Sequence, residues 1–196
     1  IDMHFTSWVF PKGHRVRLSI NNAQWPMLWP TRDPMIATLH LGGGSRLALP
    51  VVPFEKRPVP AFLPPAESPA MPEFEALDTG TSSGYGEISS IDRNPQTGAA
   101  TVTATNTGGT RYPWGTERYH EIIRHSVKDG EPARAAAVGS HRMEVELPGR
   151  SLAWEAELSF SSDHENFYYS YRRRLLENDR LLRERTWTDT IPRDFQ

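Results

Sequence analysis

Cysteine is absent from the 196-residue chain, which excludes a disulfide framework, a thiolate nucleophile and a cysteine-ligated zinc site. Long apolar runs are also missing. No segment approaches the roughly 20 residues of a membrane helix, and the first residues show no basic-then-apolar signal pattern. Neither sign of charge dominates, because 22 Lys and Arg face 24 Asp and Glu. Nucleic acid and anionic membranes are therefore poor candidate partners.

Alternating apolar residues are the main structural signal. They occur in "HRVRLSI" (14–20), "HRMEVEL" (141–147) and "SLAWEAELSF" (151–160), and a period of two is typical of a strand with one buried face. The segments 35–41 and 45–52 also resemble strands. Turn-forming residues separate the runs at 92–98, 106–109, 128–130, 148–149 and 178–179. The pattern predicts an all-β fold of short antiparallel strands, in which Trp154, Phe160, Tyr169 and Trp187 belong to the core.

Residues 171–185, "YRRRLLENDRLLRER", have the composition of a helix. Their leucine pairs lie six residues apart, which fits a helical stripe poorly, and they flank "END" symmetrically. We therefore predict a hairpin, because β-rich residues extend both arms. The basic run 172–174 is interpreted as a solvated strand face or tip.

Eight of the 17 prolines fall within residues 50–72. Proline fixes φ and lacks a ladder donor, so this segment cannot be a central strand or a helix. We predict three parts: residues 1–53, a proline-rich strap or linker over 54–79, and an antiparallel β-rich domain over 80–196.

Two short segments partly match serine-hydrolase motifs. Residues 80–84 satisfy G-x-S-x-G around Ser82, but no buried strand precedes them and no helix follows. A loop is the expected structure. "HLGGGS" (40–45) is similar to an esterase oxyanion loop, yet Leu41 interrupts it and a glycine-rich hairpin is favoured.

"HEIIRH" (120–125) nearly matches a zinc-binding H-E-x-x-H motif. Its histidines, five residues apart, would lie about 140° apart on a helix and on opposite faces of a strand. We therefore predict no metal site, and the sequence indicates no cofactor.

Four aromatic residues beside prolines are the remaining candidate binding residues: Trp25, Trp29, Tyr112 and Trp114. Exposed aromatic residues on β-rich domains often bind ligands. The alternative is that they cap the ends of a core or pack against a neighbouring domain.

The first 53 residues carry a further pattern: Gly13-His14-Arg15 in a turn, a polar-aromatic-Pro bend at residues 22–26, and a Ser-x-Leu-x-Leu-Pro strand at residues 45–50. This pattern resembles the end of the C-terminal β-domain of the CocE/NonD family, which includes cocaine esterase, glutaryl acylase and the X-Pro dipeptidyl-peptidases. Residues 80–196 resemble, more weakly, a β-rich extension that follows this domain in some bacterial members.

The resemblance implies a jelly-roll portion, with Arg15 bonding carbonyls or a carboxylate near its turn. It also implies an upstream α/β-hydrolase domain of the same polypeptide, which carries the serine, histidine and aspartate of acyl transfer. No residue of this chain matches those positions, so no catalytic residue is predicted. The chain would buttress that domain and its substrate pocket. Strands from residues 80–196, or a second copy of the chain, are expected to cover the sheet formed by residues 1–53.

Two other functions remain open. The chain could be a small-ligand or carbohydrate-binding β-sandwich that uses its loop aromatics. It could also be an independent enzyme that pairs Ser82 with His120 or His125.

Overall fold

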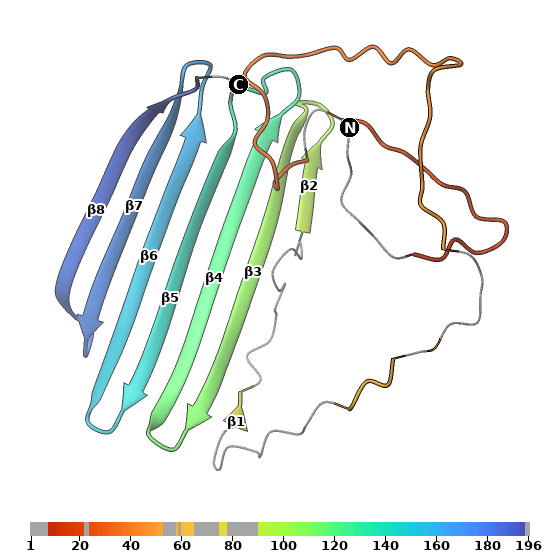
Figure 1. Ribbon diagram of the computed structural model, residues 1–196. Coiled ribbons are helices and arrows are strands. Elements are labelled where there is room, and N and C mark those ends of the chain that lie inside the picture. The colour runs from red at the N-terminus through yellow and green to blue at the C-terminus, as the bar shows by residue number, and fades with distance from the viewer. Residues whose placement is uncertain are drawn as a thin grey trace.

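The computed structural model describes residues 8–21, 24–52, 58, 60–64, 75–77 and 90–194. Its strands are β1 (Glu75–Ala76), β2 (Ser90–Asn94), β3 (Ala99–Tyr112), β4 (Gly115–Lys128), β5 (Ala136–Leu147), β6 (Arg150–Ser162), β7 (Asn166–Glu177) and β8 (Arg180–Pro192). All pair antiparallel in one sheet, which confirms the predicted all-β fold (Figure 1). The jelly-roll portion is not confirmed, because the described strands all belong to this sheet. No helix among the described residues has the length and apolarity to cross a membrane.

The strands from β3 to β8 follow one another in space in the order of the sequence. Short turns connect most of them, and Gly130, Gly149, Asn178 and Asp179 adopt positive φ in those turns. The pair Asn178–Asp179, with φ of 48° and 60°, forms the two-residue loop between β7 and β8. Asn and Asp tolerate this left-handed conformation, which suits the twist of a hairpin. The predicted hairpin over residues 171–185 is therefore confirmed.

The register places apolar and aromatic side chains on one face, which we call the aromatic face. Its larger members are Tyr119, Ile123, Met143, Trp154, Leu158, Phe160, Phe167, Tyr169, Tyr171 and Trp187. The opposite, polar face carries threonines, serines and charged residues. The four residues predicted for the core thus share one face. However, no large side chain among the described residues is fully buried, so this face lines no closed core.

The turn predicted at residues 106–109 is wrong, because these residues lie inside β3. The glycines at 108 and 109 serve packing instead. A Cβ added to Gly108 would lie 2.3 Å from the Tyr119 ring, so the absent side chain makes room for that ring on the neighbouring strand.

Residues 8–52 differ from the expectation most strongly. The strands predicted over 14–20, 35–41 and 45–52 are wrong, because the described residues of this region form no strand. Turns do form at two of the expected places: His14 N–H donates to the Pro11 carbonyl over 3.1 Å, and Ser45 N–H donates to the Gly42 carbonyl over 2.9 Å. The glycine-rich hairpin predicted over residues 40–45 is wrong, because no strand flanks the second turn among the described residues. Figure 1 shows this region, in red to orange, running beyond the sheet and leaving most of it uncovered. We call residues 8–52 the arm.

Candidate functional site

Trp25 and Trp29 anchor the arm to one end of the aromatic face. Their rings meet edge to face, with 5.2 Å between centroids. Trp29 also packs edge-on against Phe160 at 4.9 Å and Phe167 at 6.0 Å, and its Nε1 donates to Ser162 Oγ over 2.9 Å. Both tryptophans are partly buried. This placement agrees with the alternative in which they pack against neighbouring structure, and it attaches the arm to β6 and β7.

Arg193 reinforces this attachment just after the end of β8. It is 3% exposed. Its Nη1 donates to the carbonyls of Ala133 and Asp163 over 3.1 and 2.8 Å, and its Nη2 donates to the Pro30 carbonyl over 2.8 Å. The guanidinium also lies 4.8 Å from the centre of the Phe167 ring. Burial lowers the pKa of Arg193, but an arginine remains charged at neutral pH. One cation therefore joins the arm to two loops of the sheet.

His125 lies in the same cluster, with its ring edge-on to Trp25 at 5.9 Å. Burial lowers the pKa of His125, so the ring is neutral at pH 7. Its Nδ1 and the Nε1 of Trp25 are buried without a hydrogen-bond partner in the described part of the chain. His120, five residues earlier on β4, faces the opposite side of the sheet. The two histidines of "HEIIRH" are therefore separated by the sheet.

Tyr112 and Trp114 lie at the other end of the sheet, where β3 turns into β4. Their rings stack in parallel, with centroids 4.6 Å apart and an interplanar angle of 8°. Trp114 is 51% exposed, so one of its faces is open to solvent. The structure thus divides the four candidate aromatics into a packed pair at one end and a stacked, accessible pair at the other.

Sequence reasoning missed a polar pair in the middle of the aromatic face. His141 Nδ1 lies 3.2 Å from Glu121 Oε2, and the two residues are directly opposite on β5 and β4. They line a shallow depression of about 240 Å³ together with Leu158 and Tyr171. The only signal in the sequence is their place on the apolar side of two alternating strands, which requires the register to be known.

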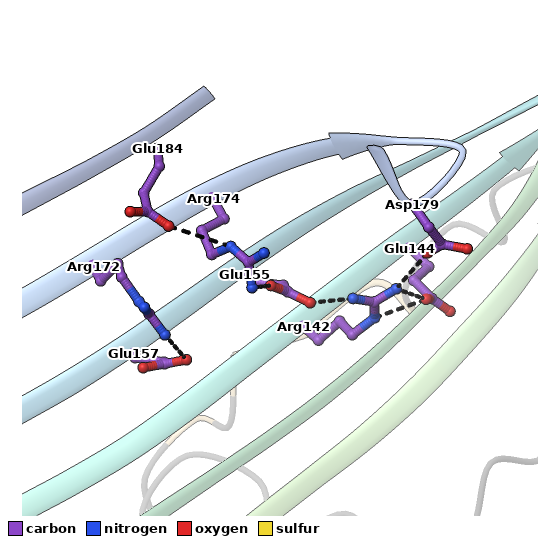
Figure 2. A network of polar contacts seen from close by, with 8 residues as sticks. All are labelled: Arg142, Glu144, Glu155, Glu157, Arg172, Arg174, Asp179 and Glu184. Carbon is purple, nitrogen blue, oxygen red and sulfur yellow. Dashed lines mark hydrogen bonds and ion pairs between the residues drawn. The ribbon is translucent and has the colours of Figure 1, made fainter. Parts of the chain in front are cut away.

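A second feature that the sequence did not reveal is a row of ion pairs across the polar face (Figure 2). Glu155 on β6 accepts hydrogen bonds from Arg142 on β5 and from Arg174 on β7, the latter over 2.9 Å. Arg174 also pairs with Glu184 on β8 at 3.4 Å. Opposite charges directly across antiparallel strands stabilise their pairing. The basic run 172–174 is therefore mostly a paired strand face, since Arg172 binds Glu157 over 2.6 Å as well.

Two arrangements typical of hydrolases were sought in the described part of the chain. No serine hydroxyl there is hydrogen-bonded to a histidine ring, and no group of three or more His, Asp or Glu residues gathers as a metal site would. Ser82 and its G-x-S-x-G motif lie outside the described residues. Arg15 makes no polar contact with the residues described, so its predicted role near the turn has no support.

Comparisons with protein-family models, with curated proteins and with solved structures find no match to this chain. The resemblance to the CocE/NonD family therefore stays a prediction.

Proposed function

We propose that this chain is a non-catalytic, β-rich C-terminal region of a CocE/NonD-type serine hydrolase. Its partner in this proposal is the α/β-hydrolase domain of the same polypeptide. The chain buttresses that domain and helps to wall its substrate pocket. The pattern in residues 13–15, 22–26 and 45–50 suggests the family, and the open surfaces of the structure support the role of a buttress.

The uncovered aromatic face is the observation that carries the proposal. All ten of its larger side chains stay partly accessible to solvent, and none of them is fully buried. Exposed apolar patches beyond a few hundred Å² mark interaction sites in soluble proteins. A sheet with aromatic residues along one side therefore needs a further layer.

The arm also exposes apolar side chains that need to be covered. Val16, Leu18 and Ile20 are all about half exposed or more, although their alternation is that of a half-buried strand. Leu47 and Leu49 repeat the pattern. Strands from a neighbouring domain would supply both the missing hydrogen bonds and the apolar cover.

Association in trans tests the proposal. In this proposal, the upstream α/β-hydrolase domain carries a G-x-S-x-G between a strand and a helix. That domain is expressed separately and mixed with this chain. We expect the two to co-purify and Leu158→Glu, on the aromatic face, to abolish the complex. Ser159→Glu, on the exposed polar face, is the matched control and should leave it intact. Equal binding by both variants would contradict the buttressing role.

Reactivity of the chain alone provides an independent test. A fluorophosphonate probe modifies activated serines, so we expect no labelling of this chain. Labelling at Ser82 would instead establish an independent serine enzyme.

A ligand-binding module is the second candidate function, and the stack of Tyr112 on Trp114 favours it. A half-exposed indole held in place by a second ring offers a flat apolar surface on which a sugar ring can lie. Titration of tryptophan fluorescence against a glycan panel tests this role. A response that Trp114→Ala removes would support it, and no response to any glycan would count against it.

A further inference from the structure

The two edges of the sheet are protected to different extents. On the outer side of β3, β1 and β2 pair with the strand, and Leu77 N–H donates to the Gly109 carbonyl over 2.9 Å. On the outer side of β8, no described strand lies alongside, and every residue of β8 except Trp187 is exposed. An uncovered edge of this length is a template for pairing with another strand.

The hydrogen bond from Arg193 N–H to the Glu165 carbonyl, 2.8 Å long, shows which backbone groups of β8 face outward. These residues are directly opposite in the register that pairs Asn166 with Pro192. Hydrogen-bonded pairs alternate along an antiparallel ladder, so the odd-numbered residues of β8 from 183 onward bond to β7.

The outward N–H and C=O groups therefore belong to Glu184, Thr186, Thr188 and Thr190. Two observations agree with this assignment. Thr190 N–H is bonded to the Asp189 side chain over 2.8 Å instead of to β7. Pro192, which lacks an N–H, also falls at an outward position, where no bond to β7 is lost.

The side chains near this edge carry uncompensated positive charge. Arg185 stands directly opposite Arg173 on β7, and like charges in this position repel. Among the described residues, no carboxylate forms an ion pair with either arginine. The Arg185 guanidinium instead lies 4.8 Å from the centre of the Trp187 ring. An acidic group arriving along the edge would be attracted here.

We propose that the outer edge of β8 pairs with β8 of a second copy of the chain, antiparallel and with the two-fold axis at Trp187. In this register Thr186 pairs with Thr188 of the second copy, and Glu184 with Thr190. All four outward residues then form hydrogen-bonded pairs, once the Thr190 N–H exchanges the Asp189 side chain for the Glu184 carbonyl of the second copy.

The side chains are self-complementary in the same register. Arg185 lies opposite Asp189 of the second copy, twice per dimer, and the two Trp187 rings meet at the axis. An isologous contact of this kind closes after two subunits. The proposal goes beyond the buttressing function: its strand pairing uses backbone groups of β8, and Arg185, Trp187 and Asp189 lie at the margin of the aromatic face.

Disulfide trapping tests the register directly, because the chain has no cysteine of its own. Across a non-hydrogen-bonded pair the Cα atoms lie about 4.5 Å apart, within the range of a disulfide. We expect Trp187→Cys to form a covalent dimer on a non-reducing gel. Thr186→Cys is the control, since its counterpart lies two residues away from the opposed position and beyond reach. Cross-linking of Thr186→Cys instead would overturn this register.

Exchanging the charges of Arg185 and Asp189 tests whether their ion pairs hold the two copies together. Sedimentation velocity over a range of concentrations should show that wild type dimerises and that Arg185→Asp or Asp189→Arg weakens association about tenfold, from the two ion pairs lost per dimer. The double variant R185D/D189R should restore it, which a merely structural role for either residue would not produce.

A proline at an outward position tests whether backbone hydrogen bonds along β8 hold the dimer together. Thr188→Pro removes a donor that β7 does not use, so circular dichroism should stay unchanged while the dimer is lost. Thr188→Ala keeps the N–H and should still dimerise. A wild-type chain that sediments as a monomer at every concentration, together with no cross-linking at position 187, would refute the proposal.

Discussion

Residues 14–20 and residues 141–147 have almost the same pattern of apolar and polar side chains, yet they occupy different environments. The second segment is the end of β5 and lies between β4 and β6, in register with both. The first lies in the arm, where the structure describes no strand beside it and Ile20 is 59% exposed. The difference shows that alternation makes a segment competent to be a strand, whereas neighbours joined by short turns make it one.

Trp29 is the centre of the contacts that attach the arm to β6 and β7. Trp29→Ala removes contacts with Phe160, Phe167 and Trp25 and the bond to Ser162. We expect a loss of about 3–5 kcal/mol in the free energy of unfolding, as for other large aromatic residues truncated to alanine. Urea denaturation followed by circular dichroism measures it. Trp114→Ala at the open end is the control and should change stability little.

Arg193→Met removes the hydrogen bonds that attach the arm to the sheet and leaves the packing of Trp29 in place. Three carbonyls lose a charged donor, and the variant keeps much of the apolar side chain. A destabilisation of about 2–3 kcal/mol is expected. Hydrogen exchange should increase in residues 24–33 more than in the middle of β5. Uniform exchange across both regions would show that Arg193 does not hold the arm specifically.

The ion pairs of the polar face contribute less. Glu155→Gln weakens bonds to two arginines on neighbouring strands and should destabilise the sheet by about 1 kcal/mol. The matched control is Glu157→Gln, which affects only Arg172 and lies at a side chain 55% exposed, against 22% for Glu155. The difference between the two variants should shrink as salt is added. A difference that salt leaves unchanged would indicate packing instead of charge.

Asp163 gives the smallest expected effect. Hydrogen bonds from the Tyr168 hydroxyl and from the backbone N–H groups of Asn166 and Glu165 lower the pKa of Asp163 to about 2. Because this pKa is depressed in the folded chain, its stabilisation is present above about pH 4 and disappears as the pH falls toward 2. Unfolding measured from pH 6 to pH 2 should show a shallow decline that Asp163→Asn lessens.

The sequence was sufficient for residues 141–147 of β5, for most of β6 and for the last hairpin, because the signals there are local. Alternation identified β5 and β6, and the Asn178–Asp179 loop with its two matching arms identified the last hairpin. The turn predicted at residues 106–109 was wrong because two adjacent glycines usually indicate a turn. Here the missing side chain of Gly108 instead leaves room for a neighbouring ring. Tyr119 is eleven residues from Gly108, so only the register reveals that contact.

The candidate residues were predictable as residue types and not as arrangements. Tryptophans beside prolines indicated loops correctly, but which pair packs on the sheet depends on contacts such as Trp29 to Ser162, 133 residues apart. The Glu121–His141 pair and the row through Glu155 depend equally on strand register. Sequence separation, and not residue choice, set the limit of the prediction.

The uncovered aromatic face has a thermodynamic consequence. The heat capacity of unfolding comes mainly from apolar surface that becomes hydrated, and here much of that surface is hydrated already. The chain should therefore have a heat capacity change below the roughly 12–15 cal/mol/K per residue of compact domains, and a stability curve that is flat with temperature. Any molecule that covers the face should reveal itself in calorimetry by a large negative heat capacity of binding.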